Sequence, residues 1–335
     1  MEPLISVVIP TYNRADLVKR AVQSALAQTI SEIEVIVIID GPHEETRLTL
    51  EEIADSRLRV IEKQTNQGCA ASRKAGIDAA KGKWVAHLDD DDEWLPEKLA
   101  KQLKAVENSK YKYPIATCFV ITRTPKGDYI LPRRILKKSE HISEYLFVRS
   151  SFFQGEGLIQ ASTIFTSKEL LEKVFPQGQR HDDWDWLLRV TTLEGVGIEF
   201  VEEPLSIWYL GENRQSLSSS KKWRYSFNWI QEKRDLVTPR AYSSFILAEI
   251  SAKAAASRDW QVFLLLLKEA SCYGNPRLKD VGLHLGMWVL TPEIRRKLRN
   301  LLRGNSQANQ EGNSAEKVES RELELAQQPQ KISPN

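Results

Sequence analysis

The sequence has few cysteines, no long apolar run and little net charge. Its three cysteines, Cys69, Cys118 and Cys272, show the spacing of neither a disulfide framework nor a zinc site, so we expect reduced thiols in a cytoplasmic protein. No stretch reaches the roughly 18 apolar residues of a membrane span, and no basic region precedes the first apolar run, so we also expect no signal peptide. The net charge of +2 disfavours a general nucleic-acid-binding surface.

The first half of the chain alternates short β-rich runs with helical patterns. This alternation is typical of an α/β fold with a mainly parallel sheet flanked by helices. Further along we expect a loop or insertion at 124–139, a helix at 181–192 and mostly helices beyond about 220. Strands are predicted at 5–9, 34–39, 58–61, 84–88, 114–122 and within 155–166, and a helix is predicted at 69–81.

The pattern divides the chain into three parts. Residues 1–217 form the expected α/β domain, and residues 218–303 form a helical C-terminal region. Residues 304–335 contain no aromatic residue and much Gln, Asn, Ser and Glu, so we expect a disordered polar tail.

Polar clusters follow four of the predicted strands. They are residues 11–13, Asp40, Asn66 and residues 89–92. The carboxyl ends of parallel strands lie at one edge of a sheet, which is where ligands bind in open α/β folds. The sequence therefore predicts one site at that edge.

The cluster at 89–92 consists of four adjacent aspartates directly after the apolar run 84–88. Packing gains nothing from such a cluster, because neighbouring carboxylates repel one another and are costly to desolvate. Mg²⁺ or Mn²⁺ would remove the conflict, since these ions prefer oxygen ligands and bind one or two carboxylates together with substrate phosphates. The alternative is a solvated acidic turn that caps the helix opened by Pro96.

Together these motifs resemble the inverting family 2 glycosyltransferases, which have a GT-A fold. The resemblance covers roughly residues 4–217 and is carried by Val-Ile-Pro-Thr-Tyr-Asn-Arg at 8–14, Asp40, Asn66-x-Gly68 with Arg73 and Gly76, and the segment 88–96. It implies an enzyme that moves a sugar from a nucleoside-diphosphate sugar, expected to be UDP-linked, to an acceptor hydroxyl with inversion. Cell-surface polysaccharide or glycolipid synthesis is the expected setting, with a saccharide or lipid-linked acceptor.

The resemblance also implies roles for single residues. The implied ligands of the metal, Mn²⁺ or Mg²⁺, are Asp91 and Asp89, with Asp92 as further support. Asp40 could instead be a turn residue, Arg73 could face a carboxylate rather than a phosphate, and Arg214 could form a surface ion pair. The implied nucleotide-sugar site consists of Pro10, Thr11, Tyr12, Arg14, Asp40, Asn66, Gly68, Arg73, Asp89, Asp90, Asp91 and Arg214.

A second acidic cluster lies at 181–189, in the sequence His-Asp-Asp-Trp-Asp-Trp-Leu-Leu-Arg. In the family an acidic pair at this place supplies the general base, which implies Asp183 as the base and Asp182 and Trp184 as acceptor contacts. The alternatives are helix capping by the aspartates and core packing of the tryptophan. His87 is expected to point to the far face of the sheet, and His181 to be a loop residue.

Residues 293–303 form a basic amphipathic pattern. Ile294, Leu298, Leu301 and Leu302 share one helical face among five basic residues. Such a helix can bind the inner face of a membrane peripherally or dock on the catalytic domain.

Two other functions fit parts of the pattern. They are a metal-dependent nucleotidyltransferase, whose usual Gly-rich, Lys-bearing phosphate loop is missing at the N-terminus, and a non-catalytic nucleotide-sugar-binding module.

Overall fold

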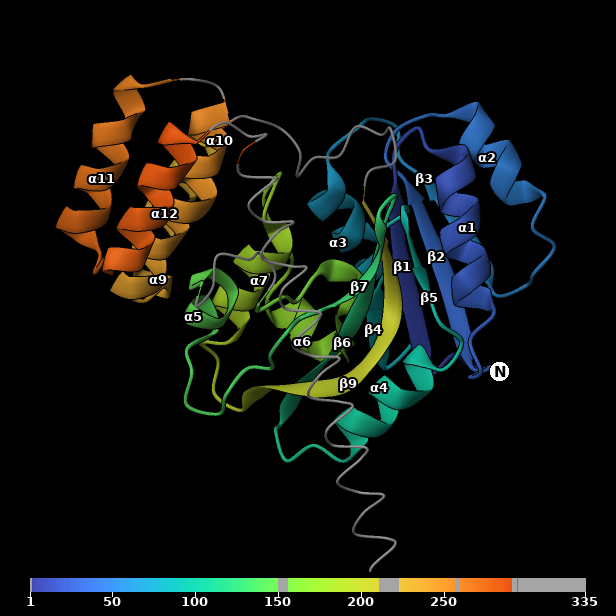
Figure 1. Ribbon diagram of the computed structural model, residues 1–335. Coiled ribbons are helices and arrows are strands. Elements are labelled where there is room, and N and C mark those ends of the chain that lie inside the picture. Colours follow the sequence, from blue (N-terminus) through green and yellow to red (C-terminus); the bar gives the residue numbers. More distant parts are fainter. Residues whose placement is uncertain (1, 150–155, 211–222, 257–258, 291–293, 295–335) are drawn as a thin grey trace, which may run out of the picture.

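A mixed β-sheet with helices on both faces organises the molecule (Figure 1). The computed structural model describes residues 2–149, 156–210, 223–256, 259–290 and 294. Within these residues the sheet has nine strands in the order β3-β2-β1-β4-β8-β6-β9-β5, and β7 pairs with β6. The α/β class expected from the sequence is confirmed.

The N-terminal half alternates strands and helices as the sequence predicts. β1 pairs in parallel with β2 and β4, and β2 with β3. Every residue of β1, β2 and β4 is buried, which explains their nearly uninterrupted apolar sequences. The elements are β1 (Ile5–Thr11), α1 (Ala15–Leu26), β2 (Ile33–Ile39), α2 (Glu44–Glu51), β3 (Leu58–Glu62), α3 (Cys69–Ala79) and β4 (Trp84–His87).

The second half adds antiparallel pairs, so the sheet is mixed rather than mainly parallel. β8 lies antiparallel between β4 and β6, and β5 pairs antiparallel with β9, whereas β6 and β9 are parallel. The elements are β5 (Asp92–Trp94), α4 (Lys98–Glu107), β6 (Tyr113–Thr124), β7 (Gly127–Leu131), α5 (Ile142–Phe147), a 3₁₀ turn (Ala161–Thr163), β8 (Phe165–Ser167), α6 (Lys168–Lys173), α7 (Asp182–Val190) and β9 (Val196–Tyr209).

Two predicted segments differ from the structure. The loop expected at 124–139 includes β7, which forms a hairpin with β6 because Gly127 adopts a φ of 114° at the turn. In the described part of 155–166 the only strand residues are the first two of β8, because a 3₁₀ turn occupies Ala161–Thr163.

Helices follow β9, as expected. They are α8 (Trp223–Glu232), a 3₁₀ turn (Arg234–Leu236), α9 (Pro239–Ser244), a π-helical segment (Phe245–Ile250), α10 (Ser251–Ala256), α11 (Gln261–Tyr273) and α12 (Leu278–Val289). Among the described residues no helix has the length and apolar character that crossing a membrane requires. Apart from Ile294, the predicted helix at 293–303 and the predicted tail at 304–335 lie outside the described residues.

Two hydrophobic clusters lie on opposite faces of the sheet. One contains Val7 of β1 and Ala86 of β4 and is covered by α1, α2 and α4. The other contains Val8 and Val85 and extends through α3, α5, α6 and α7 to α12. The helices beyond residue 223 therefore share one core with the sheet face that carries α3 and α7.

Gly76 lies where α3 packs on β1. A Cβ at this position would overlap the Cγ1 of buried Val8, whereas a Cβ on Gly282 of α12 would meet no atom within 4 Å. We expect Gly76→Ala to lower the free energy of unfolding by about 1–3 kcal/mol through overpacking. Gly282→Ala should raise it by up to about 1 kcal/mol through helix propensity. Urea unfolding followed by circular dichroism measures both, and equal effects of the two substitutions would contradict this packing.

Candidate active site

A small pocket lies where β4, α3 and α7 meet. It holds about 220 Å³ of space between its lining atoms, including the part open to solvent. The walls combine residues more than 100 positions apart in the chain, which the sheet topology brings together. They are Arg73, His87, Ala161, Ile164, Pro176, Asp182, Asp183 and Trp186.

Arg73 connects the two acidic motifs. Its side chain is only 5% exposed, and its two Nη atoms form ion pairs with Asp89 and Asp182. Burial opposes its charge, but the carboxylates outweigh that effect and hold the pKa of Arg73 well above its ordinary value. Of the two roles considered from the sequence, the structure shows the contact with carboxylates.

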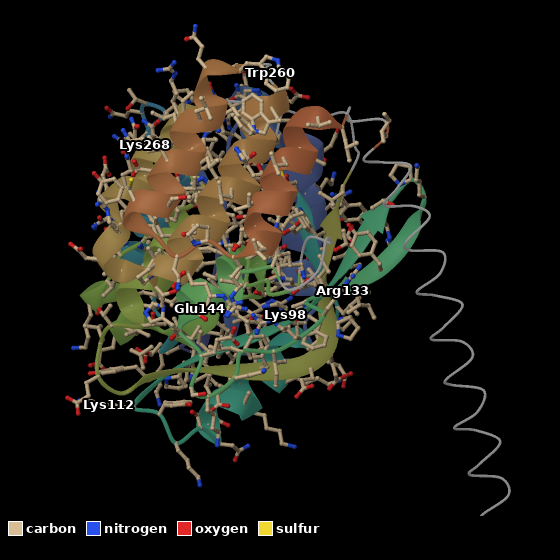
Figure 2. The ribbon with its side chains drawn as sticks, turned by 60° about the vertical axis from the view of Figure 1, so that its left-hand side comes forward. Lys98, Lys112, Arg133, Glu144, Trp260 and Lys268 are labelled. Carbon is tan, nitrogen blue, oxygen red and sulfur yellow. The ribbon has the colours of Figure 1, made fainter. Side chains whose placement is uncertain are left out.

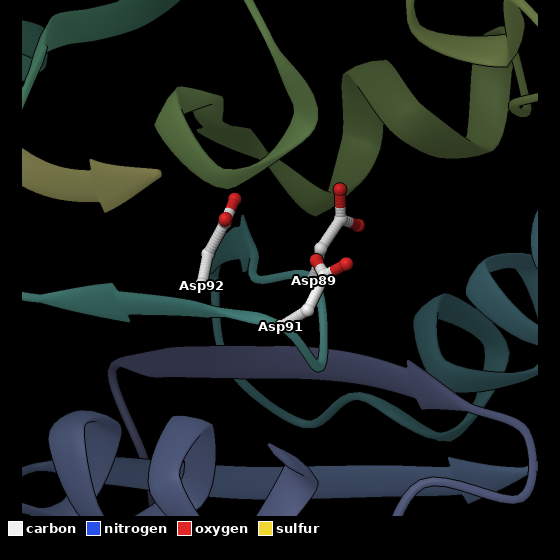
Figure 3. Close-up of side chains that lie close together, drawn as sticks. All are labelled: Asp89, Asp91 and Asp92. Atoms are coloured by element: carbon white, nitrogen blue, oxygen red, sulfur yellow. The ribbon is translucent and has the colours of Figure 1, made fainter. Parts of the chain in front are cut away.

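The four aspartates of the first motif separate into two groups. Asp89, Asp91 and Asp92 offer carboxylate oxygens that lie within 4.8 Å of one another, turned to one side of the loop (Figure 3). Asp90 instead accepts hydrogen bonds from Thr11 Oγ1 at 2.8 Å and Arg14 Nη1 at 2.9 Å. Three converging carboxylates fit a hard divalent cation.

The second and fourth aspartates are held by neighbouring elements. Burial raises the pKa of Asp90 to about 6, although the charge of Arg14 lowers it. Asp92 begins β5 and accepts hydrogen bonds from Ser162 Oγ at 2.6 Å and Gln160 Nε2 at 3.0 Å. The motif is therefore a strand-forming loop anchored in the protein rather than a solvated turn.

Asp183 lies at the second position of α7, in the pocket wall. Its Oδ1 accepts a hydrogen bond from the N–H of Trp184 at 2.8 Å. Burial, followed by the charge of Asp182, raises the pKa of Asp183 to about 7, against the opposing effect of Arg73. A carboxylate with this pKa can accept a proton near neutral pH.

His181 precedes α7 in a left-handed conformation and joins an aromatic cluster. Its ring stacks on Trp184 with centroids 4.8 Å apart, and its Nε2 lies 2.9 Å from Ser226 Oγ. Trp184 also contacts Phe147 and Trp229. Trp184 is thus partly a core residue, and its contact with an acceptor sugar stays a prediction.

His87 lies on the opposite face from the one we expected. Residues alternate along β4, so Val85 and His87 face α3 and α7 whereas Ala86 faces the other cluster. Its side chain is 3% exposed, and burial together with Arg73 and Lys98 lowers its pKa to about 3, so the imidazole is neutral. Neither ring nitrogen has a hydrogen-bond partner among the described residues.

Asp185 is a positioning residue that sequence reasoning missed. It is 3% exposed and accepts from Arg189 Nε at 2.6 Å, and its other oxygen lies 2.8 Å from Lys233 Nζ, just beyond α8. The ion pair with Lys233 joins α7, which also carries Asp183, to the C-terminal helices. The i,i+4 spacing of Asp185 and Arg189 was the available signal.

The predicted nucleotide residues gather at the ends of β1 and β2. Asp40 accepts from the N–H groups of Gln67 at 2.9 Å and Gly68 at 2.7 Å, and from Lys63 Nζ at 2.8 Å. It therefore holds the loop before α3 and is more than a turn residue.

Other predicted donor residues line this region. Tyr12, which follows Pro10 and Thr11 of β1, is 49% exposed. Asn66 Oδ1 accepts from the N–H of Gly68, whose φ of 91° favours glycine and whose Cβ position faces open space. Arg214 lies outside the described residues.

Comparison with known proteins places the chain in a protein family. The family model described as glycosyl transferase family 2 matches residues 6–175. The chain is 37% identical over 228 residues to an uncharacterized glycosyltransferase of Haemophilus influenzae, covering 64% of this chain and 71% of that protein. It is 26% identical over 253 residues to the amylovoran biosynthesis glycosyltransferase AmsB of Erwinia amylovora, covering 71% and 82%.

A further relative carries a more specific name. The UDP-Glc:alpha-D-GlcNAc-diphosphoundecaprenol beta-1,3-glucosyltransferase WfaP of Escherichia coli is 36% identical over 124 residues, which cover 36% of this chain and 49% of that protein.

The raised pKa of Asp183 predicts a pH-dependent gain in stability for Asp183→Asn. The folded-state pKa of about 7 exceeds the ordinary value of 3.8, so ionisation of Asp183 destabilises the folded protein. This penalty is absent below the unfolded pKa, grows between the two values and is complete above about pH 7. We expect Asp183→Asn to raise the Tm at pH 8 and to have a much smaller effect at pH 4, which is close to the unfolded pKa.

Thermal unfolding at both pH values, with Asp78→Asn as the control, measures this effect. Asp78 is an exposed residue of α3 that pairs with Lys74. A lower Tm of Asp183→Asn at pH 8 would contradict the prediction.

Proposed function

The chain belongs to glycosyl transferase family 2, and from this premise we propose that it transfers a sugar from a nucleoside-diphosphate sugar to an acceptor hydroxyl with inversion. Relatives of the chain act in polysaccharide biosynthesis. The proposal rests on the two ion pairs of Arg73, which join the acidic motif after β4 to the helix that bears Asp183. Donor and base are thereby assigned to adjoining parts of one site.

The proposed donor is a UDP-sugar, which is supported by the donor named for WfaP. The exposed ring of Tyr12 at the end of β1 is suited to stacking on the base. Arg14, which contacts Asp90 and Asp91, is suited to the diphosphate. Asp40 and the loop it holds border the same edge of the sheet.

The proposed metal site consists of Asp91 and Asp89, with Asp92 beside them. Their converging oxygens support the binding of Mn²⁺ or Mg²⁺. The ion, when bound, supplies Lewis-acid stabilisation of charge on the departing nucleoside diphosphate.

Asp183 is the proposed general base. It takes the proton of the acceptor hydroxyl, whose oxygen forms the new bond to the anomeric carbon. The bond from that carbon to the diphosphate oxygen breaks in the same displacement, and the diphosphate leaves with the electron pair. Attack opposite the leaving group inverts the configuration. The pKa of about 7 supports this role, because about half of the carboxylate is then ionised at neutral pH and is basic enough to accept a proton.

The proposed acceptor is a saccharide or a lipid-linked saccharide, which is supported by the diphosphoundecaprenol-linked acceptor named for WfaP. Asp182 and Trp184 are the neighbours of Asp183 in α7, and we propose that both contact the acceptor. A lipid-linked acceptor fits a cytoplasmic protein that meets the inner face of the membrane through residues 293–303.

Donor binding can be tested by thermal shift. We expect UDP with Mn²⁺ to raise the Tm in a metal-dependent way, by an amount equivalent to about 2.7 kcal/mol at a hundredfold excess over Kd. Asp91→Ala should abolish the metal-dependent part, and the exposed Asp78→Ala should retain it. A shift that is independent of the metal, or unchanged in Asp91→Ala, would disprove this metal assignment.

Transfer itself can be tested at the base. We expect Asp183→Asn to lower kcat by about 10²–10⁴-fold while the thermal shift with UDP and Mn²⁺ remains. The wild-type kcat/KM should fall below a pH of about 7, since the base must be ionised. Wild-type rates in Asp183→Asn together with loss of transfer in Asp182→Asn would move the role to Asp182. Donor binding by the wild type without turnover on any saccharide acceptor would favour the non-catalytic module.

A further inference from the structure

Exposed apolar side chains concentrate on the last described helices. Eight of the fourteen exposed large hydrophobic residues in the described parts of the chain lie between 260 and 294. The other six are spread over residues 12–135, on both halves of the sheet. Scattered exposed apolar residues need no explanation, but a concentration of them marks an interaction surface.

The packing of α11 against α12 places these side chains on one side. Phe263 stacks on His284 with ring centroids 4.5 Å apart, and Trp260 contacts Trp288 at 5.1 Å, so the two helices run antiparallel. Leu264 and Leu285 each follow a residue of the Phe263–His284 contact. In an antiparallel pair the next residue on each helix turns to the same side, because the two helices have the same hand.

The outer face of α12 carries no polar side chain along its length. Leu278, Leu285 and Val289 are 94%, 45% and 74% exposed, and their spacing of seven and four residues aligns them on one stripe. Gly282 completes that stripe with open space above it. We call Trp260, Leu264, Leu278, Leu285 and Val289 the apolar face of α11–α12. In Figure 2 these helices are turned toward the viewer, and Trp260 lies near one end of them.

The core does not need this face. Val262, Leu266 and Ala270 of α11 and Leu283 and Trp288 of α12 are already buried on the inner side. A helix that only covers a core carries polar residues on its outer side. The exposed apolar stripe of α12 is therefore not required to form the core.

The exposed charged side chains beside the face are basic. Within the described residues 259–290 the chain has three Lys and Arg and three Asp and Glu. Lys268 (Figure 2) and Arg277 are exposed. Two of the three acids are turned inward, because Glu269 accepts from the Tyr242 hydroxyl at 2.6 Å and Asp280 is 3% exposed in the cap of α12.

We propose that the apolar face of α11–α12 docks on the surface of an anionic lipid bilayer. Apolar side chains would enter the interfacial region while the surrounding basic residues meet lipid phosphates. Trp260 suits such a boundary, because its ring is apolar and its N–H is polar. A second copy of the chain is the less suitable occupant, because it would bring the exposed basic side chains Lys268 and Arg277 of two copies together.

Docking of α11–α12 on lipid is a property beyond the proposed transfer reaction and does not depend on it. It extends membrane contact from the segment 293–303 to folded helices. Both would then anchor the protein from the same end of the chain.

The test is vesicle flotation of the full-length protein. The vesicles contain phosphatidylethanolamine with phosphatidylglycerol, or phosphatidylcholine alone. We expect the wild type to bind the anionic vesicles and not the neutral ones. The variant Leu278→Ser/Leu285→Ser/Val289→Ser should lower the partition coefficient at least about tenfold. The control variant Leu48→Ser/Val60→Ser/Ile130→Ser, which removes three exposed apolar side chains elsewhere, should bind like the wild type.

A second variant guards against misfolding of the first. Leu278→Asp changes a side chain that is 94% exposed at the first position of α12, where an acidic residue suits the helix dipole. It should fold and still bind anionic vesicles severalfold more weakly than the wild type. Equal binding by all variants, or no binding by the wild type, would overturn the proposal. So would a dimer, detected by light scattering, that the Leu278→Ser/Leu285→Ser/Val289→Ser variant loses in the absence of vesicle binding. The thermal shift with UDP and Mn²⁺ reports the donor site separately.

Discussion

The buried ion pairs of Arg73 are the constraint on which the site depends. The charge of a guanidinium that is 5% exposed is compensated by Asp89 and Asp182, which face it from two different motifs. The same contacts hold α7 against the end of β4. They also set the environment of Asp183, whose pKa is raised by burial and by Asp182 and lowered by Arg73. The ion pairs of Arg73 thus affect both the position and the pKa of the proposed base, although burial is the main cause of the raised pKa.

The two halves of the sheet contribute differently to this arrangement. The parallel half delivers the ends of β1, β2 and β4 to one edge, as a parallel sheet must. The second half supplies the anchors: β5 begins within the acidic motif, and Ser162 and Gln160 hold Asp92. Because Asp90 and Asp92 are bound by the protein, the backbone of the motif is held at the proposed metal site.

The C-terminal helices pack against the α/β part of the molecule and share its core. They share the hydrophobic cluster of α3 and α7, and the contacts of Asp185 with Lys233 and of His181 with Ser226 join α7 to them. A surface that docks on lipid at α11–α12 would therefore be connected rigidly to the helix that carries the base. If the proposed acceptor is lipid-linked, this connection would hold the lipid surface and the proposed active site in one frame.

The sequence by itself determined the α/β class, the four strands of the parallel half and the clusters at their ends, because buried parallel strands are continuous apolar runs and their polar ends stand out. It did not determine which face of β4 carries His87, since alternation along a strand defines two faces but not which one α7 covers. Nor did it determine the partners of Arg73, the separate contacts of the four aspartates at 89–92, or the exposure of Leu278. Each of these depends on contacts between residues far apart in the chain, which only the tertiary structure brings together.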